Sequence, residues 1–264
     1  MDILKRSLAP ITGQAWDELD EQASQILTDR LTARRFVDVA GPFGWDHGAI
    51  TLGHLDNPDE SNQNGVEYGI HQVLPLTEVR VPFTLSISDL DDISRGAEDA
   101  DLEPLEEAAR QIAAFEDRAL YYGFKNGRID GLSESSEHQK LSCPKDAKQV
   151  LQCVPEGISL LKQSSIEGPY ALVVDPTDWR DITSYAEGYP LKRQVQENLD
   201  ANLVFCPNID DMFLVSERGG DFKLTLGGDL SLGYEGHTGD DLHLYFAESF
   251  TFRVLEPAAV VMFE

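Results

Sequence analysis

An alternating apolar pattern near the C-terminal end constrains the fold more than any other feature. Between residues 242 and 254, one parity carries Leu242, Leu244, Phe246, Phe250, Phe252 and Val254. Successive side chains of a strand point to opposite faces, so the pattern predicts a single β-strand with an apolar face. It would run for roughly 40 Å, against a usual strand length of about five or six residues. Glu248 is the only charged residue on that face, which predicts a bulge or a specific partner. A strand this long favours a structural building block.

Two segments are predicted to form long amphipathic helices. The first follows Thr12 as N-cap, and its apolar stripe is Trp16, Leu19, Ala23, Ile26, Leu27 and Leu31. The second covers residues 101–122 and ends at Gly123. Its length of about 20 residues corresponds to roughly 30 Å. This predicted helix is therefore nearly as long as the predicted strand.

Residues 48–88 are predicted to form a projecting β-arm. A polar turn at 57–65 separates two extended stretches, and a second alternating run covers residues 79–87. A hairpin that stands alone is marginally stable in water. We therefore expect the arm to pack on a neighbouring molecule.

Residues 133–220 alternate between short strands and helices, which predicts a compact α/β unit. Helices are expected at 145–164, 176–186 and 191–199, and strands at 169–174, 203–205 and 212–215. Pro155 should kink or split the first helix. A further short strand is predicted at 34–39.

Composition excludes several classes of function. The 264 residues are 41% hydrophobic, enough for one or two domains, and carry a formal charge of −26. That charge argues against nucleic acid as a partner, because phosphate binding needs clustered Lys and Arg. The absence of a long apolar run predicts no membrane span and no signal peptide. The odd cysteine count of three predicts reduced thiols in a cytoplasm.

Motifs for catalysis or metal binding are missing. The sequence lacks a Gly-x-Ser-x-Gly elbow, a His-Glu-x-x-His zinc motif and glycine-rich phosphate loops. The six histidines are scattered, and none pairs with another at the spacing of helical metal ligands. We therefore expect no enzyme activity, no catalytic residue and no metal site.

Short motifs along nearly the whole chain resemble those of the encapsulin (linocin-like) shell proteins, a family with the HK97-like fold of phage major capsid proteins. They are Leu4-Lys5-Arg6-Ser7-Leu8-Ala9-Pro10, Arg35-Phe36-Val37-Asp38-Val39, Gly41-Pro42-Phe43-Gly44-Trp45, Phe115-Glu116-Asp117, Ile166-Glu167-Gly168-Pro169-Tyr170, Val215-Ser216-Glu217-Arg218-Gly219-Gly220-Asp221-Phe222-Lys223-Leu224 and Asp229-Leu230-Ser231-Leu232-Gly233-Tyr234. Each motif alone is weak, and their common order carries the resemblance.

The resemblance implies an α+β chain divided as in that family. Residues 1–47 would hold the N-terminal helix and the start of the P-domain, and residues 48–88 the E-loop arm. Residues 89–132 would carry the spine helix, 133–220 the A-domain, and 221–264 the returning P-domain with the long strand. Glu248 would then meet a partner from a neighbouring subunit.

The resemblance also implies two sites. A groove for the C-terminal targeting peptide of a cargo protein would be formed by Leu27, Leu31, Arg34, Phe36, Asp38, Asp229, Leu230 and Leu232. A pore loop at the five-fold axis would consist of Ser184, Tyr185, Ala186, Glu187, Gly188, Tyr189 and Pro190. A ring of Glu187 carboxylates would favour small cations. The alternative for the first site is that its apolar residues belong to the core and that Arg34 and Asp38 form a local ion pair. The alternative for the second site is an ordinary loop without a role in transport.

The partners implied are other copies of the chain, about 60 in the smallest closed shells, and a cargo protein. Ferritin-like proteins and dye-decolourising peroxidases are common cargoes of the family, with iron storage as one role. Some members stack a flavin on a tryptophan after the alternating strand. Residues 85–90 here contain no aromatic side chain, so no flavin is expected. The alternatives are a phage or prophage major capsid protein and a secreted bacteriocin or protease.

Overall fold

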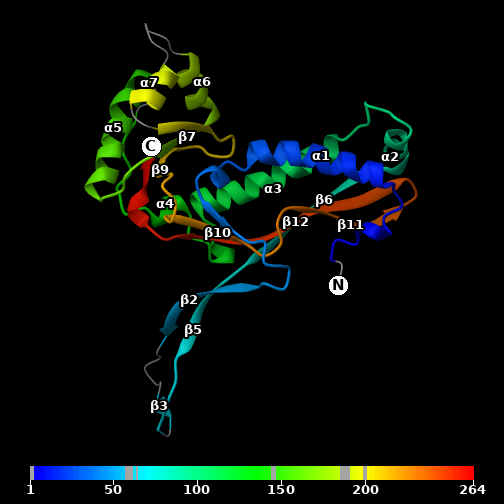
Figure 1. The fold of residues 1–264 in the computed structure, drawn as a ribbon, viewed down its shortest axis with the longest axis horizontal. Coiled ribbons are helices and arrows are strands. Elements are labelled where there is room, and N and C mark those ends of the chain that lie inside the picture. Colours follow the sequence, from blue (N-terminus) through cyan, green and yellow to red (C-terminus); the bar gives the residue numbers. More distant parts are fainter. Residues whose placement is uncertain (1–2, 57–61, 64, 144–146, 185–190, 199–200) are drawn as a thin grey trace.

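The predicted long strand lies at the centre of the protein. The computed structural model describes residues 3–56, 62–63, 65–143, 147–184, 191–198 and 201–264. Strand β12 (Asp241–Val254) is 14 residues long and belongs to a five-stranded sheet (Figure 1). The other strands of this sheet are β1 (Asp38–Ala40), β6 (Thr77–Ser86), β10 (Phe222–Leu226) and β11 (Ser231–Thr238). The alternation in the sequence therefore predicted the spine of the sheet correctly.

Strands β10 and β11 follow one another along the same edge of β12. β10 pairs with residues 250–254 of β12, and β11 pairs with residues 241–247. The loop between them lies beside Ser249, whose backbone N–H donates to the Gly228 carbonyl at 2.9 Å. On the other edge, β6 pairs with β12 in unbroken register. Of the two alternatives predicted at Glu248, a bulge or a specific partner, β12 therefore shows no bulge. Glu248 lies where the neighbouring strand is interrupted.

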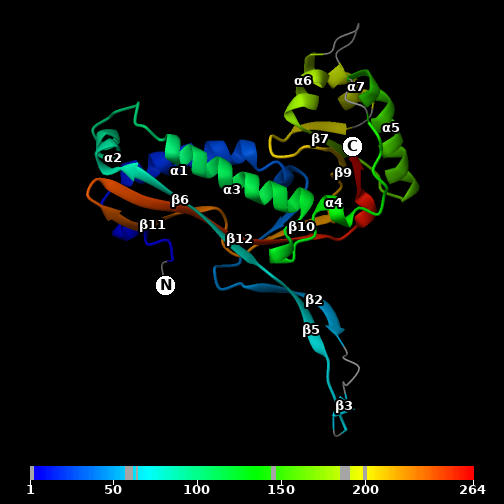
Figure 2. The same ribbon diagram turned by 180° about the vertical axis from the view of Figure 1, so that it is seen from behind.

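Two helices cover one face of this sheet side by side. They are α1 (Gly13–Arg30) and α3 (Glu103–Tyr122), as both ribbon views show (Figures 1 and 2). Thr12 caps α1, because its Oγ1 accepts a hydrogen bond from the Ala15 N–H at 3.2 Å. The short helices η1 (Arg6–Leu8), η2 (Ala33–Arg35) and α2 (Ile87–Ser94) flank this layer. Apolar side chains of α1, α3, β11 and β12 form one core between helices and sheet.

A two-stranded arm projects from the sheet. Strand β2 (Ala49–Asp56) pairs antiparallel with β5 (Ile70–Pro75), and β3 (Asn62–Gln63) pairs with β4 (Val66–Glu67) near the tip (Figure 1). The chain then continues into β6, which leaves the arm and joins the main sheet. The range of 48–88 expected for the arm thus includes a ten-residue strand that the structure places beside β12. Exposed apolar side chains on the arm are Leu55, Val66, Tyr68, Ile70 and Val73.

A second sheet forms the core of the α/β unit. Its order is β13-β9-β7-β8. The strands are β7 (Tyr170–Val174), β8 (Ala201–Phe205), β9 (Met212–Ser216) and β13 (Val260–Phe263), and the larger helices around them are α5 (Ala147–Gln163), α6 (Pro176–Ser184) and α7 (Leu191–Asn198). The end of the chain, expected in the returning P-domain, supplies β13 and so closes this second sheet. The remaining short helices are η3 (Lys125–Gly127), α4 (Leu132–Ser135) and η4 (Pro257–Ala259).

Three local expectations are corrected. Residues 33–35 form the 3₁₀ turn η2, and only the last two residues of the predicted strand at 34–39 belong to a strand, β1 (Asp38–Ala40). Helix α5 is a single element that contains Pro155, so of the kink or split expected at this proline the split does not occur. Cys143 and Cys153 form a disulfide with a Cα–Cα distance of 5.7 Å, and Cys206 is the remaining free thiol. Cysteine spacing gave no signal for this pair.

Helices in the described residues are either too short or too polar to cross a bilayer. The same residues hold no cluster of three or more His, Cys, Asp or Glu side chains that would suit a metal ion.

Candidate functional site

A groove of about 540 Å³ opens between α1, the N-terminal segment and the connection from β10 to β11. One wall comes from one face of α1, and the opposite wall comes from residues 229–232. The lining residues are Leu4, Arg6, Asp20, Ala23, Ser24, Leu27, Thr28, Leu31, Arg34, Arg35, Asp229, Leu230, Ser231, Leu232 and Phe246. Segments far apart in the sequence therefore build one surface.

The apolar part of the groove follows from helical spacing. Ala23, Leu27 and Leu31 are each four residues apart, which places them along one face of α1. Leu230 and Leu232 come from the opposite wall. Leu31 and Leu232 are buried, whereas Leu27 and Leu230 remain partly exposed. Partly covered apolar side chains in a concave surface are suited to hold an apolar segment of another chain.

The N-terminal segment is held on the sheet by hydrogen bonds to its backbone carbonyls. The Tyr234 N–H donates to the Leu4 carbonyl at 2.8 Å, and the Tyr245 hydroxyl donates to the Ile3 carbonyl at 2.9 Å. Arg6 then reaches α1, where it pairs with Asp20 at 2.6 Å and lies over the Trp16 ring. These contacts make the segment a third wall of the groove.

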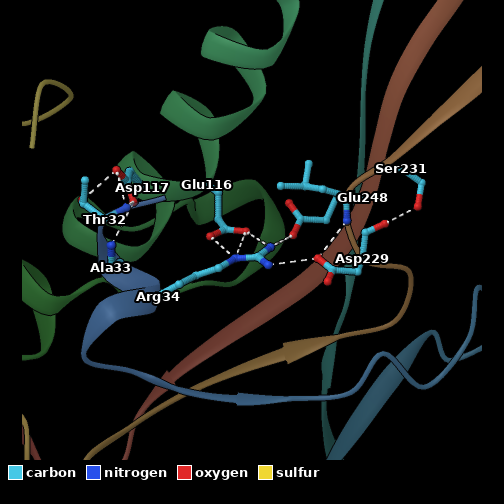
Figure 3. Close-up of polar contacts among 9 residues, drawn as sticks. Thr32, Ala33, Arg34, Glu116, Asp117, Asp229, Ser231 and Glu248 are labelled. Carbon is cyan, nitrogen blue, oxygen red and sulfur yellow. Dashed lines mark hydrogen bonds and ion pairs between the residues drawn. The ribbon is translucent and has the colours of Figure 1, made fainter. Parts of the chain in front are cut away.

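Arg34 is bound by three carboxylates from three different elements (Figure 3). Its Nε donates to Glu116 of α3 at 2.9 Å, and its Nη2 donates to the same carboxylate at 2.6 Å. Nη2 also donates to Glu248 of β12 at 2.5 Å, and Nη1 donates to Asp229 at 2.9 Å. Arg34 therefore ties the turn after α1 to the spine helix, to the central strand and to the wall that carries Leu230.

The charges in this cluster do not cancel. Glu116 and Glu248 are fully buried, and the Arg34 side chain is 17% exposed. Burial and the nearby charge of Glu116 raise the pKa of Glu248 well above its ordinary value. Burial lowers the pKa of Arg34, but its contacts with Glu116, Glu248 and Asp229 outweigh that effect and raise it. One cation thus faces two buried carboxyl groups, and the raised pKa favours a proton on Glu248.

A third buried carboxyl group, that of Asp117, fixes the turn that carries Arg34. Asp117 accepts hydrogen bonds from the Thr32 N–H at 3.1 Å, the Thr32 hydroxyl at 2.8 Å and the Ala33 N–H at 3.2 Å (Figure 3). Asn208 donates to the same carboxylate at 3.3 Å. Burial raises the pKa of Asp117 to about 6, although these hydrogen bonds lower it. Two neighbouring residues of α3 therefore hold η2: Asp117 binds its start, and Glu116 binds the Arg34 side chain in its middle.

Most of the residues expected in the groove lie there. Those that line it are Leu27, Leu31, Arg34, Asp229, Leu230 and Leu232. Phe36 instead packs in the core, with its ring centroid 6.0 Å from that of Phe222. Asp38 accepts a hydrogen bond from the Gly220 N–H at 2.6 Å and pairs through β1 with β10. Both placements correct the expected set, and the Arg34–Asp38 ion pair is replaced by the carboxylate cluster.

The sequence did not assign Glu116 and Glu248 to the site. Both are fully buried and bind the Arg34 guanidinium. Glu248 is the lone charge of the apolar face of β12, and the partner expected from a neighbouring subunit is instead Arg34 of the same chain. Glu116 belongs to the motif Phe115-Glu116-Asp117, which carried only a family resemblance. The sequence signal for Glu248 is a single charged residue within an apolar alternation.

The predicted pore loop lies almost entirely outside the described residues. Ser184 is the last residue of α6. The other six members, Tyr185, Ala186, Glu187, Gly188, Tyr189 and Pro190, fall in the range that the structure does not describe.

A family model described as "Encapsulating protein for peroxidase" (Linocin_M18) matches residues 1–251. The chain is 40% identical to the type 1 encapsulin shell protein of Rhodospirillum rubrum over 268 residues, which covers 99% of this chain and 96% of that protein. It is also 40% identical to the type 1 encapsulin shell protein of Rhodococcus erythropolis, with 99% of each chain covered.

Solved structures with a similar fold are capsid-like particles. The virus-like particle of Pyrococcus furiosus matches with a TM-score of 0.66 at 17% identity and covers 94% of this chain and 98% of that one. The capsid of Myoviridae phage XM1 matches with a TM-score of 0.56 at 12% identity, and covers 88% of this chain and 90% of that one. At these identities the likeness concerns the fold.

Proposed function

Because this chain belongs to the family of encapsulin shell proteins, we propose that it is the subunit of a self-assembling, icosahedral nanocompartment that encloses a cargo protein in the cytoplasm. The groove beside α1 is the site that captures the cargo, through a short C-terminal targeting peptide. The observation that supports this most directly is the convergence of Leu27, Leu31, Leu230 and Leu232 on one partly open apolar surface. Apolar anchors in a groove supply binding energy, and polar groups beside them fix the register.

The proposed cargo is a peroxidase or an iron-storing, ferritin-like protein. The name of the matching family model favours the peroxidase. Small ions and substrates would enter through pores, one of them at the 184–190 loop. That part of the proposal rests on the resemblance of the sequence, since only Ser184 of the loop is described.

The competing function, a phage major capsid protein, shares the fold. Phage capsids match at 8–14% identity, whereas encapsulin shell proteins match at 34–40% over at least 96% of the chain. The higher identity over the full length favours the cargo shell. Purified particles that contain a host enzyme support the proposal, whereas particles that package DNA contradict it.

The groove is tested by Leu230→Asp, which places a charge among the apolar side chains. Removing a leucine contact of about 1.5 kcal/mol or more should lower cargo content by roughly tenfold or more. Particles are purified from the native host, and cargo per shell is measured by quantitative mass spectrometry. The matched control is Leu8→Asp, because Leu8 is 67% exposed and does not line the groove. Intact Leu230→Asp particles with the cargo content of the wild type would overturn the assignment of the groove.

A further inference from the structure

The groove contains three arginines in three different electrostatic states. Arg6 pairs with Asp20 at 2.6 Å, so its charge is matched by one carboxylate. Arg34 faces Glu116, Glu248 and Asp229. The third, Arg35, lines the groove and is exposed. These states differ although Arg34 and Arg35 are neighbours in the sequence.

Arg34 has almost no donor left for a ligand. A guanidinium has five N–H groups, and the Nε–H, both Nη2 hydrogens and one Nη1 hydrogen are directed to carboxylates. Turning the guanidinium toward a peptide would leave the buried Glu116 carboxylate without its cation, which is strongly unfavourable. Arg34 is therefore occupied by carboxyl groups of its own chain and is unsuited to bind a ligand.

Arg35 is in the opposite situation. Within the ranges that the structure describes, its side chain makes no hydrogen bond or ion pair, although its backbone N–H bonds to Thr32. Asp117 fixes the residues before it, so the start of the Arg35 side chain is held in place at the groove. A planar guanidinium that is held at its base and free at its end suits the recognition of a carboxylate.

We propose that the two neighbouring arginines have separate roles: Arg34 is a positioning residue that holds the wall with Asp229 and Leu230, and Arg35 binds a carboxylate of the docked cargo peptide. This inference rests on the proposed function of the groove. The carboxylate belongs either to an acidic side chain or to the C-terminus of the cargo. In a chain with a formal charge of −26, an acidic peptide needs such a local cation to dock.

The hold of Arg34 on the wall is direct. Its Nη1 bonds to Asp229 Oδ1, and the same oxygen accepts the Leu230 N–H at 2.8 Å (Figure 3). The Ser231 hydroxyl donates to the Asp229 carbonyl at 2.7 Å, which continues the turn toward Leu232. Loss of the Arg34 bonds should thus displace the apolar wall and weaken every ligand equally. Loss of Arg35 should weaken only ligands that carry the carboxylate.

The test measures peptide binding to cargo-free particles by fluorescence anisotropy. The probe is the labelled C-terminal segment of the protein that co-purifies with wild-type shells. It is made with a free terminal carboxylate, with a terminal carboxamide, and with each acidic residue changed to its amide. We expect one of these changes to weaken binding to the wild type about tenfold, and the form that does so identifies the carboxylate. Raising the ionic strength should reduce this difference.

Variants separate the two arginines. In Arg35→Gln particles the difference between carboxylate and amide probes should vanish, and in Arg35→Lys particles much of it should persist. Arg34→Lys should weaken all probes by the same factor and keep the difference. Arg110→Gln is the matched control, because Arg110 pairs with Glu106 and Glu107 on α3 and does not line the groove. Electron microscopy establishes that each variant forms particles.

The possible failures are distinguishable. A probe that binds no wild-type particle contradicts the proposed function of the groove. A probe that binds the wild type equally well in all its forms, or an Arg35→Gln variant that keeps the full difference, overturns the role of Arg35 alone. If Arg35→Gln does not assemble, Arg35→Lys and the salt dependence of the wild type decide the question, since a carboxylate effect that salt leaves unchanged would contradict an exposed ion pair.

Discussion

Glu248 shows how one side chain can acquire its properties from three elements at once. It is fully buried in β12, opposite the break between β10 and β11, and it receives a hydrogen bond from Arg34 of the η2 turn. Its Oε2 has no hydrogen-bond partner among the described residues. Glu116 of α3 competes for the same guanidinium. With two carboxyl groups and one cation in a buried site, protonation of Glu248 relieves the excess negative charge.

This site should make stability depend on pH. The pKa of Glu248 is raised in the folded state, so the folded chain binds a proton more tightly than the unfolded chain. The resulting stabilisation is fully present below the ordinary pKa of about 4.5 and is lost as pH rises toward the raised value. Glu248→Gln keeps the shape and the acceptor but removes the titration. We expect the apparent Tm of wild-type particles to fall more steeply than that of the variant as the pH rises above the ordinary pKa of a glutamate.

The measurement is differential scanning calorimetry at one scan rate, because unfolding of large assemblies is often irreversible. A difference of about 1 kcal/mol corresponds to a few degrees in Tm for a chain of this size. Glu98→Gln, at an exposed position, is the control and should follow the wild type. Parallel pH profiles for wild type and Glu248→Gln would contradict the raised pKa.

At the scale of elements, two junctions hold distant parts of the chain together. One is the η2 turn, which Asp117 and Glu116 join to the spine helix. The other is the segment before α5, where Leu141 and Cys143 form backbone hydrogen bonds with Met262 and Glu264 at the C-terminal end. The Cys143–Cys153 disulfide connects this second junction to α5. Backbone pairing therefore joins the segment before α5 to the C-terminal end of the chain, and the disulfide links that segment to α5.

The disulfide predicts a definite thiol count. Denatured protein without reductant should expose one reactive thiol per chain, Cys206, and three after reduction. The loop spans a sequence separation of 10, and a cross-link of that size stabilises the folded state by about 3 kcal/mol in the chain-entropy description. Cys153→Ser should lower the apparent Tm to the value of the reduced wild type. A thiol assay that finds three free thiols without reductant would refute the link.

At the scale of the whole molecule, the arm exposes apolar side chains that no other part of the described chain covers. It extends away from both sheets, and Val66 and Ile70 are 64% and 57% exposed (Figure 2). Apolar side chains on a projecting hairpin remain in water unless another molecule covers them. A closed shell of identical subunits would provide that cover, which agrees with the family to which the chain belongs.

Ile70→Asp should therefore block assembly and leave the subunit folded. The charge falls at the first residue of β5, toward the tip of the arm and outside both cores, so the secondary structure measured by circular dichroism should be unchanged. Size-exclusion chromatography should show small species in place of shells. Gln25→Glu adds the same charge on the exposed face of α1 and should assemble normally. Shells of normal size from Ile70→Asp would show that this part of the arm is not covered by a neighbour.

The sequence by itself determined the elements with strong periodicity. The alternation at 242–254, the stripe of α1 and the pattern that ends at Gly123 each depend on residues within one or two turns or pleats, so they can be recognised locally. The ordered motifs predicted the family, and four leucines of the groove followed from it. The sequence pattern does not mark where the arm ends, because β6 continues the alternation of the arm into the main sheet.

Only the tertiary structure decided which charges and thiols meet. Arg34 bonds to carboxylates 82, 195 and 214 residues away, and no local pattern specifies such pairs. Packing of α3, β12 and the β10–β11 loop brings the three carboxylates to one guanidinium. The same packing removes Phe36 and Asp38 from the groove and leaves Arg35 at its edge. Periodicity encodes which face of an element is buried, whereas the identity of its partners depends on how the buried faces fit together.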